Sequence, residues 1–354
     1  MKMKTKMKMH WQWWVLALFC ACSSQSTDNA VDDTSAPGST DNPVSDSLGP
    51  GNTDNPVGDT SAPGSTDNPV SDSLGPGNTD NPVSDSDNPA TDSGSDTGAA
   101  NGVLSIIGRK QDMNGAAYTS GRINSHYEVP NTPGTRVEVR AKMGRKRCND
   151  ADPFVDGTWP AIWMLGSDAT EQNYGGNVVW PGCGEIDINE WLGAWNADHY
   201  LTNQWGEPVF RAAHNVPATV PYGADGPEKW HVYGLRFNGD TITFLFNGAD
   251  QATQTYADAA GHSHRIILNM ALGGDLGGAM AADFVSDEIQ IDWVRVFDAA
   301  GDLLWQDEMN DEATTKANWF PFTGRAYNNE LQYYTNWAAD NFEWHTDMQR
   351  GECL

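Results

Sequence analysis

The sequence predicts an all-β domain over residues 101–354, built as two β-sheets that pack face to face in a jelly-roll-like sandwich. Short runs in this part alternate between apolar and polar residues, which is typical of strands with one buried face. Gly, Asn and Pro separate these runs, and no apolar pattern with helical spacing extends beyond two turns. Many short strands in one stretch of this length favour two packed layers in a single domain.

The clearest alternating runs mark the expected strands. Two of them flank Asn238 and Gly239, which is the signature of a hairpin closed by an Asn-Gly turn. We expect strands at residues 135–143, 230–237, 241–246, 265–272 and 288–297.

Residues 1–22 predict a bacterial signal peptide. Four lysines precede an apolar run from Trp11 to Ala21, and this run is about half as long as the roughly 20 residues that a membrane-spanning helix needs. Residues 18–23 resemble a lipobox, which implies that Cys22 is lipidated and becomes the mature N-terminus; cleavage without a lipid is the alternative. We therefore expect export across the inner membrane, with a lipid anchor at the outer membrane or cell surface as the only membrane contact.

Residues 23–100 predict a disordered acidic linker. They contain no Lys, Arg or aromatic residue, and residues 33–57 recur identically as residues 59–83. So few apolar side chains cannot bury a core, and the 14 Asp residues of the segment repel one another. The predicted organisation is a signal peptide, a spacer and one globular domain that begins at residue 101.

The charge of the globular part excludes one class of partner. Residues 101–354 contain 34 acidic and 17 basic side chains, whereas binding to nucleic acid phosphates needs the opposite balance. A neutral polysaccharide or a cation is a more compatible partner.

Three cysteines follow the signal peptide: Cys148, Cys183 and Cys353. In an oxidising compartment we expect one disulfide and one remaining thiol, and the sequence leaves the pairing open.

Three carboxylates lie within six residues of a short apolar run. Ile186 and Ile188 mark this run as a strand. On a regular strand Glu185 and Asp187 share one face, whereas Glu190 lies on the other. A β-bulge near Ile188 would return Glu190 to the first face, so that all three carboxylates line one cleft.

Two carboxylates on either side of a glycosidic bond can hydrolyse it, and a retaining mechanism needs them about 5 to 5.5 Å apart. We expect Glu185 to attack the anomeric carbon and Glu190 to protonate the leaving oxygen and then activate water. Asp187 would help to keep the proton on Glu190, because like charges oppose ionisation. This chemistry needs no cofactor.

Six tryptophans lie between residues 159 and 205, more than a core of this size usually needs. Indole rings stack on the apolar faces of sugars, so some of them are expected to line a groove. Trp159 and Trp180, each followed by a proline, are the favoured sugar-binding candidates, and Trp163 and Trp195 are further candidates.

Residues 159–166 and 180–188 are similar to the central signature of glycoside hydrolase family 16, and within it to the laminarinase-like bacterial endo-β-1,3-glucanases. The resemblance implies a concanavalin A-like jelly roll. It also implies that Glu185 is the nucleophile, Asp187 the assisting aspartate and Glu190 the acid/base. Asn189 stands where the family usually has Met.

The resemblance extends to other substrate-binding and metal-binding residues. Residues 118–123 look like the family strand that carries an arginine near the cleft, which implies that Arg122 and also Asn329 bind substrate. The family often holds a structural calcium ion between its first and last strands, and by resemblance Glu308 and Asp292 are among its ligands. Carboxylate oxygens suit calcium.

Two segments stand in an unusual place for this family. Residues 304–310 and 328–335 resemble segments that normally begin the domain, but here they follow residues 292–297, which resemble its closing strand. Joining the end of the chain to Asn101 would restore the usual order, so we predict a circularly permuted domain. A partial duplication after a complete domain is the weaker alternative.

The sequence therefore predicts a monomeric, retaining endo-β-1,3-glucanase that acts on laminarin-like polymers, with mixed-linkage β-1,3-1,4-glucan as a secondary substrate. An agarase- or carrageenase-type galactanase is one alternative, although sulfated galactans favour a basic cleft. A non-catalytic glucan-binding surface lipoprotein is another, and the three carboxylates oppose it. Laminarinases usually have histidines after the acid/base strand, and here only His199 follows Trp195 at short range, which leaves the linkage preference open.

Overall fold

The computed structural model describes residues 102–145, 154–170, 172, 174–195, 198–206, 218–256 and 261–345. The predicted signal peptide, the lipidation candidate Cys22, the acidic linker, Cys148 and Cys353 lie outside these residues. Residues 95–354 form one compact unit. Within the described ranges, no helix is long and apolar enough to cross a membrane.

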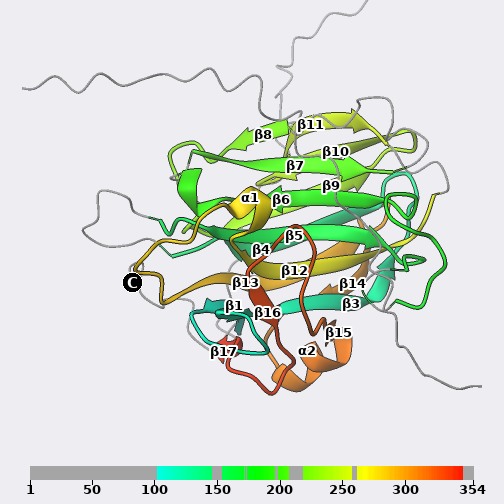
Figure 1. Cartoon of the computed structure of the whole chain (residues 1–354). Coiled ribbons are helices and arrows are strands. Elements are labelled where there is room, and N and C mark those ends of the chain that lie inside the picture. Colours follow the sequence, from blue (N-terminus) through cyan, green and yellow to red (C-terminus); the bar gives the residue numbers. More distant parts are fainter. Residues whose placement is uncertain are drawn as a thin grey trace, which may run out of the picture. The chain divides into compact units, whose positions relative to one another are not determined.

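Two β-sheets pack against each other, which confirms the predicted all-β sandwich (Figure 1). The seven-stranded sheet carries the candidate site. Its strands follow the order β15 (Trp319–Pro321), β3 (Arg122–Val129), β12 (His264–Leu272), β5 (Thr158–Gly166), β6 (Glu185–Glu190), β7 (His199–Trp205) and β8 (Ala218–Pro221). All of its neighbouring strands are antiparallel.

The second sheet has ten strands. Its main order is β11 (Ala249–Thr255), β10 (Thr241–Phe246), β9 (His231–Phe237), β4 (Arg136–Lys142), β13 (Ser286–Phe297), β1 (Val103–Arg109), β2 (Tyr118–Ser120) and β16 (Gln332–Tyr334). In addition, β14 (Leu303–Asp307) pairs with β13, and β17 (Phe342–His345) pairs with β1. The five strands expected from the sequence are therefore present as β4, β9, β10, β12 and β13.

Helical structure is minor among the described residues. α1 (Gly274–Gly277) and the 3-10 turn η2 (Gly193–Trp195) are single turns, and α2 (Glu312–Asn318) has seven residues. Asp311 begins α2, because its side chain accepts a hydrogen bond from the backbone N–H of Thr314. The absence of a longer described helix agrees with the strand-dominated pattern of the sequence.

Alternating side chains explain how the two layers form a core. On β4, Val137, Val139 and Ala141 are fully buried, whereas the charged residues between them are half-exposed. Each fully buried Val or Ile contributes about 1.5 to 3 kcal/mol of transfer free energy. The alternation of apolar and polar residues along β4 therefore stabilises the packing of the two sheets. Ile186 and Ile188 of β6 join this core, which leaves the carboxylates of β6 to the opposite face.

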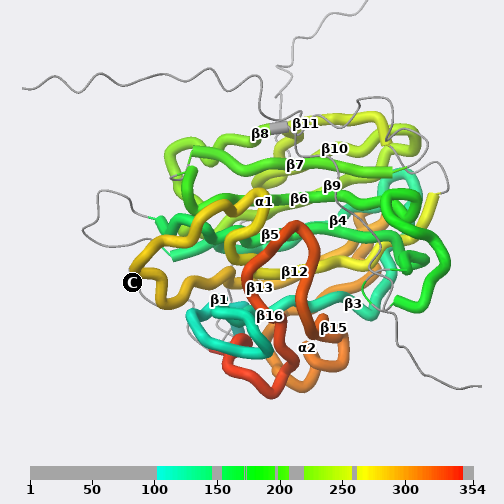
Figure 2. The backbone as a smooth tube through the Cα atoms, viewed as in Figure 1, coloured from blue at the N-terminus to red at the C-terminus, as the bar shows by residue number. Residues whose placement is uncertain are grey.

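The C-terminal part of the chain completes both sheets. Three of its strands extend the ten-stranded sheet, and β15 forms an edge of the seven-stranded sheet beside β3. Figure 2 shows this red and orange part of the tube beside the cyan start of the domain. Asn341 ties the two parts together, because its side-chain amide donates to the carbonyl oxygen of Ile107 at 2.8 Å.

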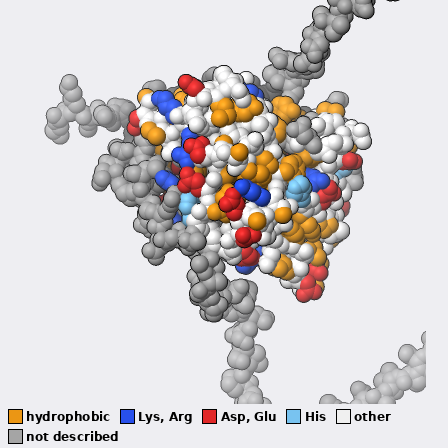
Figure 3. Space-filling model, turned by 90° about the horizontal axis from the view of Figure 1, so that it is seen from below, with side chains coloured by type: hydrophobic (Ala, Val, Ile, Leu, Met, Phe, Trp, Pro, Cys, Tyr) orange, Lys and Arg blue, Asp and Glu red, His pale blue; other side chains and the backbone are white. Residues whose placement is uncertain are grey.

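The face that lies below in Figure 1 carries mixed side chains. Figure 3 shows hydrophobic groups there between scattered positive and negative ones, with no continuous positive surface.

Candidate active site

A β-bulge lies in β6, at the place that the spacing of the carboxylates predicts. On β5, Trp163 pairs with Asp187, and the adjacent Ile162 pairs with Asn189. Ile188 is therefore the extra residue, so two residues of β6 oppose one of β5.

The pairing with β7 shows the same irregularity. A step of two residues on β7, from Asn203 to Leu201, faces a step of three residues on β6, from Asp187 to Glu190. The bulge therefore restores Glu190 to the face that Glu185 and Asp187 share. This confirms the predicted bulge and brings the three candidate carboxylates together on the cleft face of the seven-stranded sheet.

Asn189 anchors the bulge from the core side. Its side chain is fully buried, and its amide donates to the hydroxyl of Tyr222 at 3.5 Å. The hydroxyl of Tyr233 donates to the same oxygen at 3.3 Å. The polar side chain of Asn189 therefore has a polar partner in the core behind β6.

The environment of Glu190 favours its protonated form. Burial raises the pKa of Glu190 well above its ordinary value, and the negative charge of Asp187 raises it further. A hydrogen bond from the indole N–H of Trp159 to Oε1, at 3.2 Å, acts in the opposite direction. A carboxyl group that keeps its proton to a higher pH is suited to general acid catalysis.

Asp187 shares this environment. It is 6% exposed, and burial followed by the charge of Glu185 raises its pKa well above the ordinary value. Three carboxylates on one strand face therefore oppose one another's ionisation, as expected for a site that holds a transferable proton.

The predicted tryptophans lie at different depths around the carboxylates. Trp159 packs with Leu192 and Trp195, and the ring of Trp195 stacks on the imidazole of His199 at a centroid distance of 4.5 Å. Trp180 lies at a loop position beside Trp205, with ring centroids 5.5 Å apart. Trp180, Trp195 and Trp205 are half-buried, whereas Trp159, a favoured sugar-binding candidate, is only 7% exposed.

Trp191 differs from the other tryptophans near β6. It is fully buried and packs edge-on against Phe154 at 5.1 Å, so it belongs to the core.

Arg122 lies under the cleft beside Trp163. It is 3% exposed, and its guanidinium carbon is 4.5 Å from the centroid of the Trp163 ring and 5.1 Å from that of Phe322. Its Nε and Nη2 have no hydrogen-bond partner within the described ranges. Both nitrogens are buried, so the described contacts of Arg122 are its stacking contacts with Trp163 and Phe322, and they do not include an accessible donor for a sugar.

Asn329 lies at the rim of the site. It belongs to the loop between β15 and β16, which Figure 1 shows in front of β12. Its side chain is exposed and donates to the carboxylate of Asp275 in α1 at 2.8 Å. The structure thus places Arg122 beneath the Trp163 ring and Asn329 on an exposed loop beside α1.

Sequence reasoning missed three polar residues of this region. The indole N–H of Trp163 donates to Asn269 Oδ1 at 2.7 Å, and Asn269 donates to the hydroxyl of Tyr334 at 3.2 Å. That hydroxyl donates to Glu330 at 2.8 Å. Asn269 occupies the cleft-facing phase of a predicted strand, which is the one signal that could have identified it.

The residues predicted to bind calcium contact arginines instead. Arg140 donates to Asp292, and Arg295 donates to both carboxylate oxygens of Glu308 at 2.9 and 3.0 Å. Within the described part of the chain, no group of three or more His, Cys, Asp or Glu side chains could hold a metal ion. Asp292 and Glu308 therefore do not fit a calcium site, because a cation would have to displace a guanidinium group from each.

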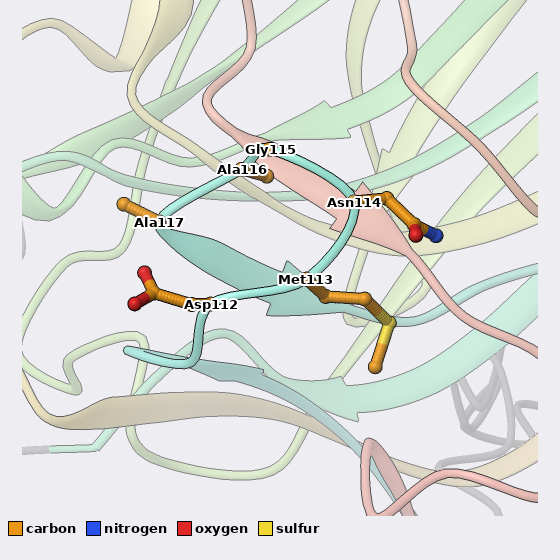
Figure 4. A pocket seen from close by; sticks show the side chains of 6 residues that line it. All are labelled: Asp112, Met113, Asn114, Gly115, Ala116 and Ala117. Carbon is orange, nitrogen blue, oxygen red and sulfur yellow. The ribbon is translucent and has the colours of Figure 1, made fainter.

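A hollow of about 380 Å³ lies away from the carboxylates. It is formed by residues 112–117 in the turn between β1 and β2 (Figure 4). None of the predicted site residues lines it, so it is a concavity of a surface turn and not part of the cleft.

Comparisons with known proteins give matches across the β-sandwich. The family described as glycosyl hydrolases family 16 matches residues 96–295. Glucan endo-1,3-beta-glucosidase A1 of Niallia circulans is 30% identical over 200 residues, which are 51% of this chain and 26% of that protein. Keratan-sulfate endo-1,4-beta-galactosidase of Sphingobacterium multivorum is 30% identical over 198 residues, covering 51% and 40%.

Among solved structures, LamAcat from Zobellia galactanivorans matches with a TM-score of 0.45 and 30% identity, over 55% of this chain and 76% of that one. The chain spans 28%, 68% and 26% of the lengths of three curated relatives, so most of these matches concern only a part of the relative.

Proposed function

The chain belongs to the glycosyl hydrolases of family 16, and from this premise we propose that it is a retaining endo-β-1,3-glucanase acting on laminarin-like polymers. Mixed-linkage β-1,3-1,4-glucan is the proposed secondary substrate. The observation that carries the proposal is the bulge of β6, which puts Glu185, Asp187 and Glu190 on one face. The raised pKa of Glu190 supports its role as the proton donor.

The proposed reaction has two steps. In the first, a carboxylate oxygen of Glu185 bonds to the anomeric carbon while the glycosidic bond breaks and the leaving oxygen takes the proton of Glu190. In the second, Glu190 removes a proton from water, the water oxygen bonds to the anomeric carbon, and Glu185 is released. Both substitutions invert the anomeric carbon, so the product keeps the β configuration.

Asp187 and Trp159 control the proton of Glu190 in this mechanism. The charge of Asp187 favours the protonated acid before the first step. The indole N–H of Trp159 fixes one oxygen of Glu190, so that the other oxygen is aimed into the cleft. No metal or cofactor takes part.

The choice of sugar unit rests on the charge of the globular part. A glucanase and a galactosidase are both 30% identical to this chain. Family membership therefore does not distinguish a glucan substrate from a galactan substrate. We favour a neutral glucan because the globular part has 34 acidic and 17 basic residues, which repels sulfated polymers. A galactanase remains the second candidate.

We also propose that the domain is circularly permuted. The family match ends at residue 295, and β14 to β17 follow it in the chain. These four strands pair with β13, β3, β2 and β1, so segments after the matched region complete sheets that the matched region begins. This arrangement supports the segment order predicted from the sequence.

For the exported protein we propose a lipid at Cys22 and an acidic spacer that holds the enzyme away from the membrane. The support is the apolar run before Cys22 and the repeat of residues 23–100. Replacing Cys22 by Ser should move the protein from the membrane fraction to the soluble fraction, and an unchanged distribution would contradict the anchor.

The function is tested by incubating the full chain and its Glu185→Gln variant with laminarin, lichenan, agarose, carrageenan and keratan sulfate. We expect new reducing ends and oligosaccharides of mixed length from laminarin with the wild type only, and NMR should detect the β anomer first. The variant keeps the shape of the side chain and loses the nucleophile.

Two outcomes would revise the proposal in different ways. Cleavage of a galactan instead of laminarin would keep the mechanism and change the substrate. A folded wild-type protein that binds laminarin without cleaving it would favour the glucan-binding alternative.

A further inference from the structure

Resting on the proposed glucanase function, we propose that Glu330 is a positioning residue for substrate binding, which acts through Tyr334 and Asn269 to orient the indole of Trp163. The four side chains come from three separate parts of the chain. They form a line of hydrogen bonds that runs from the cleft floor into the wall beside it.

Every donor in this line points toward Glu330. The Trp163 N–H donates to Asn269 at 2.7 Å, Asn269 donates to Tyr334 at 3.2 Å, and Tyr334 donates to Glu330 Oε2 at 2.8 Å. A chain of donors that ends on a carboxylate is polarised in one direction, and each bond strengthens the next. Glu330 therefore fixes which way the amide of Asn269 is turned, and Asn269 fixes the indole.

The backbone of β12 holds the far end of the line. The side-chain amide of Gln332 donates to Glu330 Oε2. The oxygen of the same amide, Oε1, accepts from the backbone N–H of Leu272 at 2.9 Å. Glu330 itself pairs with Gly273 as an isolated bridge. The carboxylate is thus locked to the strand that also carries Asn269.

Burial shows that the line acts indirectly. Tyr334 and Gln332 are 0% exposed, so neither can touch a sugar in the cleft. Trp163 is half-buried on the cleft face, opposite Asp187 in the pairing of β5 with β6. A change at Tyr334 can therefore reach the substrate only through the residues that lie between them.

Arg122 connects the same carboxylate to the ring by a second route. Its guanidinium stacks on Trp163 at 4.5 Å and lies 5.9 Å from the centroid of Tyr334. The opposite charge of Arg122 lowers the pKa of Glu330 against the larger effect of burial. Glu330 is thus linked to the edge of the indole through Asn269 and Tyr334, and to the cation on its face through the charge of Arg122.

The test compares Glu330→Gln and Tyr334→Phe with a matched control, Tyr333→Phe. Tyr333 is the neighbouring residue on β16, and its hydroxyl has no hydrogen-bond partner within the described ranges. The full chain of each variant is assayed for kcat and KM on laminarin. The indole N–H resonance of Trp163, assigned with Trp163→Phe, is recorded by ¹⁵N NMR without substrate.

We expect KM to rise about three- to tenfold in Tyr334→Phe and Glu330→Gln, with kcat changed less than twofold, since one hydrogen bond of a binding platform is lost. The double variant should be no worse than the weaker-binding single variant, because both changes break one line. The Trp163 resonance should shift in both variants and stay in place in Tyr333→Phe.

Other outcomes separate this proposal from the proposed function. An active wild type whose two variants keep KM and the Trp163 resonance would overturn the positioning role and leave the glucanase intact. A wild type that cleaves no glucan would overturn the proposed function, and the resonance would still decide whether Glu330 and Tyr334 orient Trp163. Equal losses in all three variants would indicate general damage to β16 and would also overturn the role.

Discussion

Two buried acids of the ten-stranded sheet and two of the seven-stranded sheet have opposite partners. On the ten-stranded sheet, Asp292 pairs with Arg140, and Glu288 accepts two hydrogen bonds from other polar side chains, including one from Arg145. On the cleft face of the seven-stranded sheet, Asp187 and Glu190 lie beside other carboxylates. No Lys or Arg in the described ranges forms an ion pair with either of them.

The pKa values show what this difference does. Burial raises the pKa of Asp292, and the hydrogen bond and charge of Arg140 oppose that rise. Burial also raises the pKa of Glu190, but there the neighbouring charge of Asp187 adds to the rise. Pairing, and not burial, thus separates acids that hold strands together from acids that hold a proton for chemistry.

Neutralising one acid on each sheet should give the largest difference in activity. We expect Glu190→Gln to lower kcat on the cleaved glucan by about 10² to 10⁴-fold, because the general acid is lost. Glu308→Gln, on the ten-stranded side, should keep kcat within about twofold, since its partner Arg295 is far from the cleft chemistry. Assays of reducing-end release measure both, and equal losses would contradict the division.

Removing Arg140 tests whether the paired acids of the ten-stranded sheet stabilise the fold. Arg140→Met leaves Asp292 buried without its cation, and we expect the free energy of unfolding at pH 7 to fall by about 2 to 3 kcal/mol. This is below the range for fully buried pairs because the Arg140 side chain is 31% exposed. Urea unfolding measures the loss, and adding Asp292→Asn should recover part of it.

The sign of the pH dependence follows from burial. The pKa of Asp292 in the folded variant lies above that in the unfolded chain, so the penalty grows as pH rises above the unfolded pKa and disappears below it. A deficit that stays constant from acid to neutral pH would point to lost packing instead of an unpaired charge.

Two substitutions should move the alkaline limb of the activity profile in opposite directions. Asp187→Asn removes the charge that raises the pKa of Glu190, so activity should fall at a lower pH than in the wild type. Trp159→Phe removes the hydrogen bond that lowers this pKa, so activity should persist to a higher pH. Profiles of kcat/KM measure both shifts, and movement in the same direction would contradict the assignment.

We expect calcium to have the smallest effect, measured as a change in the melting temperature. Since Arg140 and Arg295 occupy Asp292 and Glu308, we expect EDTA or added calcium to change the melting temperature by less than about 1 °C. Thermal unfolding in both conditions checks this. A rise of several degrees with calcium would show that a donor set exists outside the described residues.

The bulge of β6 was predictable because its evidence is local. Two isoleucines and three acids within six residues specify both faces of the strand, and only an extra residue reconciles them. The hairpin around Asn238 and Gly239 was predictable for the same reason, since its turn chemistry is contained in the turn.

Contacts between distant segments were not predictable. Asn269 and Tyr334 are 65 residues apart, and the sequence around each residue does not indicate that it contacts the other. The arginine partner of Asp292 was equally unpredictable, because Arg140 lies 152 residues away on β4. Alternation predicts which face a side chain takes, but strand order decides which side chains share that face.

The pairing of β17 with β1 has a consequence for how the protein is made. β1 is among the first strands to leave the ribosome, yet one of its edges stays open until β17 has been synthesised. An open strand edge is a template for wrong pairing, so the nascent chain is most exposed to mispairing at this stage. A chain that terminates early would also lack the wall that carries Glu330. Residues 330–345 therefore complete both the ten-stranded sheet and the hydrogen-bond line to Trp163, so the two form at the same stage of synthesis.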